Sequence, residues 1–275
     1  MILSMLSQLT VLTSIPVFPQ LNLQYWPYYL LVLVRSSGFF MLSPIFGRRN
    51  LPPQYRLGLA LILAVMFIQL YPPAAPFTSE PDLTYIVMVT GEILTGLIIG
   101  FVTMLFFAIP AIAGQIIDIQ IGIGMGAVFD PSMGAQTTYS AHLLSIAMTV
   151  YFFLMDGHLM LIRIFGMTYE RIPVGEVGFD PRLATVAIES FYLVFSMGIT
   201  LALPIIGAAF VSEVTMGVLM RAVPNFHAYM VGIPLKIIIG LAVLFAMQPF
   251  YIGFCENIFD RMFQAMNNMI AGMGG

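Results

Sequence analysis

Ionisable side chains lie within or beside the apolar stretches of this 275-residue chain, and they are the residues best placed to do chemistry. A charge at the centre of a bilayer costs about 2.5–3.5 kcal/mol on insertion scales, so such side chains face protein or water rather than lipid. The six residues concerned are Arg35, Glu92, Asp118, Glu189, Glu213 and Lys236.

Three kinds of chemistry fit these residues. Interior ion pairs would fix the packing of helices, contacts with another subunit would neutralise the charges in an assembly, and a relay would carry protons or ions across a membrane. A relay needs a carboxylate near the middle of a clear span, and Glu92 and Glu189 meet that requirement. The sequence leaves the three interpretations open.

Catalytic and metal-binding spacings are absent from the sequence. His142, His158 and His227 lie in three separate regions, without an H-E-x-x-H pattern. A G-x-S-x-G motif is also missing. Cys255 is the only cysteine, so it forms no internal disulfide, and we expect it to be a small buried apolar residue. We therefore predict no enzymatic activity, no cofactor and no metal.

The composition predicts a membrane protein. Only 8% of the residues are charged and 60% are hydrophobic, whereas a soluble domain carries roughly 25% charged residues. The mean hydropathy is +0.96. The net charge of −3 argues against a nucleic-acid partner, because such partners are bound by basic surfaces.

Six apolar stretches predict an all-α integral membrane protein with about six helical segments, and five to seven are plausible. We expect one domain over residues 1–275, because no polar insertion is long enough to fold alone. The stretches are Tyr28–Phe46, Leu57–Tyr71, Leu83–Ile112, His142–Ile164, Leu183–Leu219 and Tyr229–Phe254.

The charges of the loops do not fit a simple bundle of spans. The positive cluster Arg48, Arg49 and Arg56 predicts a cytoplasmic loop, but alternation then places the arginine-containing 163–182 region outside. Prolines also interrupt the apolar runs, and we expect Pro110 and Pro204 to kink or break two long stretches. Broken helices are tolerated in a membrane only where protein or a water-filled cavity covers them. The other prolines in or beside apolar runs are Pro44, Pro234 and Pro249.

Two regions are rich in glycine. Gly96 and Gly100 form a small-xxx-small pair that predicts the close approach of another helix, inside the chain or from another subunit. The apolar segment Ala113–Pro131 is predicted to be a poor continuous helix and to form a hairpin that bends into a central cavity as a plug or constriction. Its G-x-G-x-x-A string from Gly122 to Ala127 is not a nucleotide site, because no strand–turn–helix unit frames it.

An ordered set of short motifs runs through the chain. Its first part comprises Arg35, Pro44, Gly91, Glu92, Gly96, Gly100, Ala113, Gly114, Gln115, Gln120, Gly122, Phe129, Asp130, Pro131, Gly134, Gln136, Asp156, Gly157, His158, Ile172, Pro173 and Gly175. Its second part comprises Ala202, Leu203, Pro204, Ile205, Glu213, Gly217, Arg221, Ala222, Val223, Pro224, Gly232, Ile233, Pro234, Leu235 and Lys236. In this order and spacing the chain resembles the FliR family, the export-gate proteins of flagellar type III secretion.

The resemblance implies a non-enzymatic subunit of a secretion gate in the bacterial inner membrane, at the flagellar basal body. One copy would assemble with five FliP and four FliQ subunits into a hetero-oligomeric gate built from broken helical hairpins, with FlhB and FlhA alongside. Unfolded flagellar proteins would pass when a plug moves. The plug and channel residues would be Gly114, Gln115, Asp118, Gln120, Gly122, Gly124, Gly126 and Phe129, with Ile121, Ile123, Met125 and Val128 sealing the channel.

The resemblance also implies roles for residues outside the plug. Arg35, Glu92, Glu213, Arg221 and Lys236 would be interior or interface charges. The motif residues with a structural role would be Asp130, Pro131, Asp156, Gly157, His158, Pro204 and Pro224.

The sequence departs from the family pattern at two places. It has Pro224-Asn225-Phe226-His227 where the family often has Pro-Gln and Asn-Val, and His158-Leu159 where two histidines are common. The alternatives are an injectisome export-gate subunit and a proton-coupled secondary transporter, although transporters commonly contain repeats that this chain lacks. An intramembrane enzyme is the third class.

Overall fold

The structure is a computed structural model that describes residues 25–46, 52–72, 83–123, 138–222 and 228–274. Over these ranges the chain forms helices and no strand, which confirms the all-α prediction. The helices are α2 (Trp26–Leu42), α3 (Pro53–Leu70), α4 (Leu83–Phe107), α5 (Ile109–Ile121), α7 (Tyr139–Leu154), α8 (Gly157–Arg171), α9 (Arg182–Ala222), α10 (Ala228–Ala246) and α11 (Gln248–Met273).

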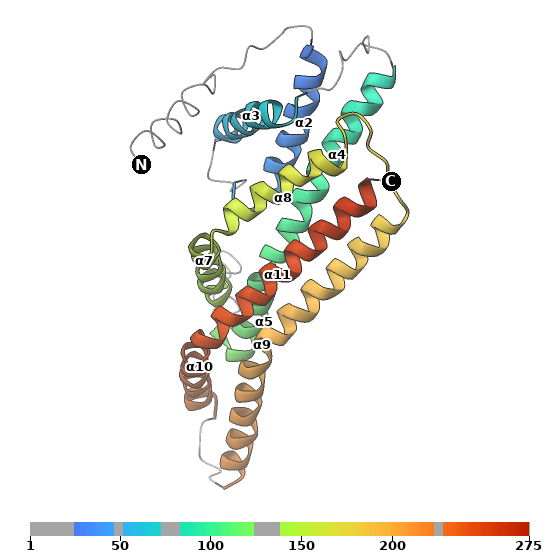
Figure 1. The fold of residues 1–275 in the computed structure, drawn as a ribbon. Helices are drawn as coiled ribbons and strands as arrows, with labels where there is room; N and C mark the ends of the chain where they lie inside the picture. The colour runs from blue at the N-terminus through green and yellow to red at the C-terminus, as the bar shows by residue number, and fades with distance from the viewer. Residues whose placement is uncertain (1–24, 47–51, 73–82, 124–137, 223–227, 275) are drawn as a thin grey trace, which may run out of the picture.

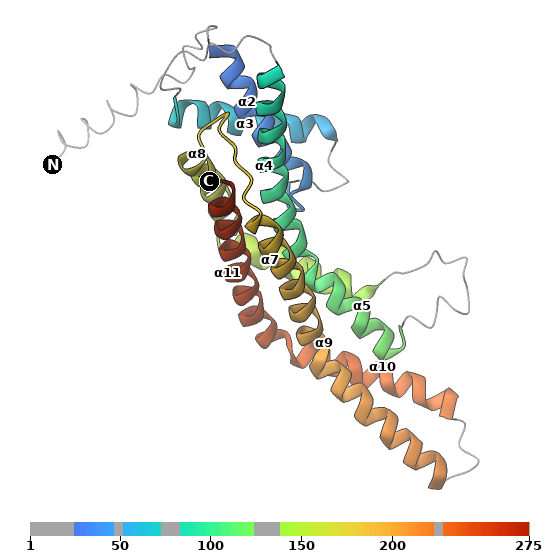
Figure 2. The same cartoon turned by 90° about the vertical axis from the view of Figure 1, so that its right-hand side faces the viewer.

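The helices form an elongated molecule. In Figures 1 and 2, α2, α3 and α8 gather around α4 at one end, while α10 and the last turns of α9 lie at the other. The end of α11 returns to the connection between α8 and α9, where the N–H groups of Gly178 and Asp180 donate to the carbonyls of Met273 (3.3 Å) and Gly272 (3.1 Å). The core is therefore drawn from helices far apart in sequence.

Prolines mark where several helices begin. Pro27, Pro53, Pro110 and Pro249 each lie at the first or second position of a helix, where the missing N–H has no partner in any case. The predicted interruption near Pro110 is found at Ala108, between α4 and α5. By contrast, α9 runs through Pro204 without a break. Figure 1 shows α9 bending near its middle, which agrees with a kink, the other outcome expected for this proline. A proline costs a helix interior about 3 kcal/mol, and 41 residues of continuous helix tolerate that loss.

Two pairs of helices are sharply bent. The axes of α7 and α8 differ by 71° and those of α10 and α11 by 60°. The first bend is made at Asp156, whose φ of 55° is left-handed. The next residue, Gly157, packs closely against Phe152. A Cβ at this position would lie 2.4 Å from the Phe152 ring, so a larger residue does not fit. These bends show that two of the apolar stretches are broken helices.

Several of the apolar helices are long enough to cross a membrane, which agrees with an all-α membrane protein. By length and composition, Leu83–Ile121 and Arg182–Ala222 qualify among the described residues, and the total rises to four if each bent pair is one span. Gln54–Leu70 is apolar but short.

Candidate functional site

A buried ion pair joins α2 to α4. Arg35 Nε and Nη2 donate to the two carboxylate oxygens of Glu92, with Nη2 2.9 Å from Oε1. Neither side chain has any exposed surface. This bidentate geometry matches the planar fork of a guanidinium to a carboxylate, and it gives the pair a fixed orientation as well as energy.

The same ion pair holds the chain that leaves α8. Arg35 Nη1 and Nη2 donate to the Ile172 carbonyl at 3.2 and 3.3 Å, and the Gly175 N–H donates to Glu92 Oε1 at 2.8 Å. The guanidinium carbon also lies 4.5 Å from the centroid of the Tyr169 ring. A buried ion pair is favourable only when its other donors and acceptors are satisfied, and here they are. Of the three interpretations open for Glu92, the structure shows the ion pair.

Glycines allow α2 and α4 to touch backbone to backbone. A Cβ on Gly96 would lie 2.1 Å from the Arg35 carbonyl, and one on Gly100 would lie 2.8 Å from the Phe39 carbonyl. The predicted close approach at these two glycines is confirmed as a contact inside the chain. Gly38 is the matching position on α2, where a Cβ would lie 2.8 Å from the Ile93 carbonyl, and the sequence analysis did not identify it.

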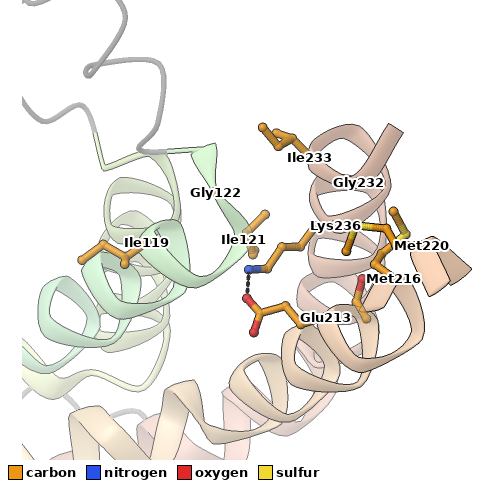
Figure 3. Close-up of a pocket in the computed structure, with 10 residues that line it drawn as sticks. Ile119, Ile121, Gly122, Glu213, Met216, Met220, Gly232, Ile233 and Lys236 are labelled. Carbon is orange, nitrogen blue, oxygen red and sulfur yellow. Dashed lines mark hydrogen bonds and ion pairs between the residues drawn. The ribbon is translucent and has the colours of Figure 1, made fainter. Parts of the chain in front are cut away.

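A second ion pair crosses from α10 to α9. Lys236 Nζ donates to Glu213 Oε1, as Figure 3 shows. The Lys236 side chain is 21% exposed and that of Glu213 is 53% exposed, so water screens this pair. The two interior pairs therefore differ in kind, because only Arg35 and Glu92 are fully removed from water.

The Lys236–Glu213 pair lies at the edge of a pocket between α5, α9 and α10 (Figure 3). Its volume is about 350 Å³, within the usual range for ligand sites. The apolar part of its lining comes mainly from the end of α5 and from methionines, whose flexible side chains adapt to irregular surfaces. The lining residues are Ile119, Ile121, Gly122, Ser212, Glu213, Met216, Met220, Gly232, Ile233 and Lys236.

The predicted plug segment Ala113–Pro131 is helical as far as Ile121, and the helix ends at Gly122, so no continuous helix runs through the segment. Gly114 lies inside α5, where a Cβ would be 2.2 Å from the Ala141 Cα of α7. Gly114 therefore provides close packing between α5 and α7. The helix ends at Gly122, whose φ of 90° is left-handed and whose N–H donates to the Asp118 carbonyl. Glycine adopts that conformation without strain.

The two faces of α5 differ. Gln115 is exposed and Gln120 is partly exposed, whereas Asp118 is 3% exposed and faces α7. The Asp118 carboxylate accepts the Ser140 N–H at 3.1 and 3.3 Å. Asp118 thus points away from the solvent-exposed face that Gln115 occupies.

The remaining predicted residues are dispersed. Glu189, Pro204 and Arg221 are exposed on α9. Asp156 makes the bend before α8, and His158 packs against Phe153 with ring centroids 5.3 Å apart. Outside the described residues lie Gly124, Met125, Gly126, Val128, Phe129, Asp130, Pro131 and Pro224.

No group of three or more His, Cys, Asp or Glu side chains that could hold a metal ion occurs in the described part of the chain. Cys255 is buried, as expected from its sequence context.

Comparison with known protein families shows to which family the chain belongs. The profile of the bacterial export proteins, family 1, matches residues 26–262. The chain belongs to that family. This bears out the resemblance that the ordered motifs carried.

Members of the family are similar to this chain over nearly their whole length. The flagellar biosynthetic protein FliR of Bacillus subtilis is 29% identical over 90% of this chain and 96% of its own. FliR of Escherichia coli K12 is 26% identical over 91% and 94%. FliR of Aquifex aeolicus is 27% identical over 88% and 93%. These similarities and the apolar helices indicate a flagellar export protein in a membrane.

The sequence analysis did not predict several of the contacts that this export protein makes. Ser140 and Ile172 contribute backbone atoms, which carry no signal in residue type. Tyr169 could have been suspected, because aromatic rings often face buried guanidinium groups. No local pattern links either backbone partner to Asp118 or Arg35.

Proposed function

We propose that the chain is a non-enzymatic subunit of the flagellar type III protein export gate in the bacterial inner membrane. It assembles there with five copies of FliP and four of FliQ, next to FlhB and FlhA, and unfolded flagellar proteins cross the gate. Supply of energy belongs to other components. Membership of the export family and flagellar relatives support this proposal over the injectisome alternative.

The observation that carries the proposal is a row of exposed apolar side chains along α9, which we term the α9 apolar stripe. Its members are Ile188, Tyr192, Phe195, Ile199, Leu203, Phe210, Val214 and Val218, each at least 47% exposed. Their spacings of three, four and seven residues put them along one side of the helix.

The stripe is longer than lipid can cover. From Ile188 to Val218 it extends about 45 Å along the helix, and the hydrocarbon core of a bilayer is about 30 Å thick. Even at a tilt of about 40°, the upper end of the range seen for spans, it would reach about 34 Å across the membrane. Protein partners are the natural cover for the remainder, as a gate subunit requires.

A proton-coupled transporter fits the structure less well. Glu92 accepts hydrogen bonds from Arg35 and Gly175 and has no exposed surface, so no water can reach it for proton exchange. Glu189 is exposed on α9 rather than enclosed. Neither carboxylate lies on an interior path.

The plug remains part of the proposal. Near the described end of the segment, Ile119, Ile121 and Gly122 line the pocket beside α9 and α10. We propose that the residues following Gly122 close the channel and that Ile121 and Ile123 help to seal it. Deleting Met125–Asp130 should then raise the leak of small ions without preventing assembly.

Native mass spectrometry of the affinity-tagged chain, expressed with its native operon, tests the assembly. One copy of the chain with five FliP and four FliQ subunits is the expected result. A stable monomer or homo-oligomer without those partners would overturn the proposal.

A further inference from the structure

The connection between α8 and α9, residues 172–181, is bonded in its first half to α2 and α4. We term this connection the α8–α9 strap. Arg35 of α2 donates to the Ile172 carbonyl at 3.2 and 3.3 Å, and Glu92 of α4 accepts the Gly175 N–H at 2.8 Å. Gly175 has a left-handed φ of 90°, which residues with a side chain rarely adopt. The buried ion pair thus fixes the first half of the strap.

The second half of the strap is bonded to the end of α11, which lies beside it in Figures 1 and 2. The Gly178 N–H donates to the Met273 carbonyl at 3.3 Å, and the Asp180 N–H donates to the Gly272 carbonyl at 3.1 Å. Both carbonyls belong to the last turn of α11, where carbonyls have no acceptor role inside the helix to fill. The strap therefore caps α11, and α11 in return fixes the second half of the strap.

The first two turns of α9 depend on this strap for their position. None of the residues Arg182 to Glu189 is buried, so packing against other helices places them only weakly. Instead, the Asp180 carboxylate accepts the Arg182 N–H at 2.8 Å, and Leu183 touches the same end of α11, since a Cβ on Gly272 would lie 3.0 Å from its Cδ2. The start of α9 is thus placed by the strap and by the helix end that holds it.

The α9 apolar stripe begins in the same part of the helix. Its first two members, Ile188 and Tyr192, are 69% and 76% exposed, more than any of the other six. A partner subunit that covers the stripe at this end must therefore meet side chains whose position follows from the strap.

We propose that Gly178 and Asp180 are positioning residues for assembly of the gate: through their bonds to α11 they fix the start of α9, so that Ile188 and Tyr192 meet a partner subunit. This inference rests on the proposed function. The bonds come from backbone N–H groups, so a proline at either position removes the donor while other substitutions keep it. Loss of a bond would let the start of α9 shift and would weaken the contact with the partner.

The test removes one bond from each half of the strap. Gly178→Pro removes the N–H that bonds Met273, whereas Gly178→Ala keeps it and is the matched control, because the only atom near a Cβ there is the Met273 carbonyl oxygen at 4.0 Å. Gly175→Ala acts on the first half, because alanine is strained at a φ of 90°.

The readout is the amount of FliP and FliQ retained per copy of the affinity-tagged chain, measured by native mass spectrometry of the purified complex. Gly178→Pro and Gly175→Ala should each lower retention by at least about fivefold, while Gly178→Ala should stay within about twofold of the unaltered protein.

A double-mutant cycle separates positioning from general stabilisation. Ile188→Ala/Tyr192→Ala should lower retention by itself and should add little to Gly178→Pro, because both changes lose the same contact. Phe210→Ala/Val218→Ala, at the far end of the stripe, should instead multiply the effect of Gly178→Pro. A role in stability alone would multiply the effects at both ends.

Three results would overturn the inference. They are unchanged retention in Gly178→Pro and Gly175→Ala, equal loss from Gly178→Pro and Gly178→Ala, and multiplied effects at both ends of the stripe. If Gly178→Pro does not fold, Gly175→Ala replaces it in the cycle and the same results apply.

The unaltered chain separates this inference from the proposed function. If it retains neither FliP nor FliQ, the proposed function fails. If it retains both and the strap variants do so equally well, the proposed function stands and only the role of the strap is rejected.

Discussion

Arg35 and Glu92 form a bidentate ion pair between α2 and α4 from which water is fully excluded. The same two side chains bond the backbone of Ile172 and Gly175, so they set the path of the chain from α8 toward α9. Two charges 57 residues apart in sequence thereby hold α2, α4 and the backbone at Ile172 and Gly175 in fixed positions relative to one another.

Removing one member of this ion pair should strongly destabilise the folded protein. Glu92→Ala leaves the Arg35 guanidinium buried without its counter-charge, and we expect a loss of about 3–5 kcal/mol in the free energy of unfolding. The measurement is thermal unfolding of the detergent-purified protein. Glu189→Ala, an exposed carboxylate on α9, is the control and should change stability by less than about 0.5 kcal/mol.

Replacing both charges tests whether the loss comes from the unpaired charge. The double variant Arg35→Met/Glu92→Leu should be clearly more stable than Glu92→Ala, because no charge then remains in the interior. A double variant as unstable as the single one would show that the bonds to Ile172 and Gly175 dominate.

The pair of Lys236 and Glu213 should behave differently. Because Glu213 is 53% exposed, Glu213→Gln should cost no more than about 1 kcal/mol, and added salt should reduce even that effect. Thermal unfolding at low and high ionic strength checks both points. A cost similar to that of Glu92→Ala would mean that exposure does not control the strength of these pairs.

Gly96 should not tolerate a methyl group. Gly96→Ala places a Cβ 2.1 Å from the Arg35 carbonyl, so the α2 backbone must move and the ion pair with it, and we expect a loss of at least about 2 kcal/mol. The matched control is Gly253→Ala in α11, where a Cβ meets nothing within 4 Å. That change should be neutral or should stabilise by up to about 1 kcal/mol, because alanine favours a helix.

The α9 apolar stripe should be needed for assembly rather than for folding. Phe195→Ala/Ile199→Ala removes two exposed side chains near its middle, at 55% and 47% exposure. If partners cover them, retention of FliP and FliQ during purification should fall at least tenfold, while the chain alone unfolds at the same temperature. The control is Leu61→Ala/Ile62→Ala on α3, at 51% and 65% exposure. Equal effects from both double variants would show that the α9 stripe is not special.

The helices themselves follow from the sequence. Long apolar runs form helices because a bilayer or an apolar interior leaves no other acceptor for backbone N–H groups. Prolines at Pro110 and Pro249 mark helix starts for the local reason that they lack an N–H. The close helix contact at Gly96 and Gly100 could likewise be predicted, because small residues at that spacing commonly mark where two helices approach closely.

Other features depend on the surroundings of a residue. Pro204 lies inside α9 without interrupting it, and Gly114 lies inside α5 although the segment that follows it does not continue as a helix past Ile121. At both positions the neighbouring helices supply packing that outweighs a local propensity of a few kcal/mol or less. A bend such as the one at Asp156 likewise leaves no mark in hydropathy, so the sequence did not reveal it.

The sequence by itself determined the class of the protein, its family and the residues that carry charge into the interior. Only the tertiary structure decided their partners: Glu92 for Arg35, Glu213 for Lys236, and the Ser140 N–H for Asp118. The physical reason is that composition and local spacing act within a few turns of helix. A buried charge instead takes whichever donor or acceptor the packing of distant helices brings within about 3 Å, and two of the groups bonded to Arg35 and Asp118 are backbone atoms that no residue type reveals.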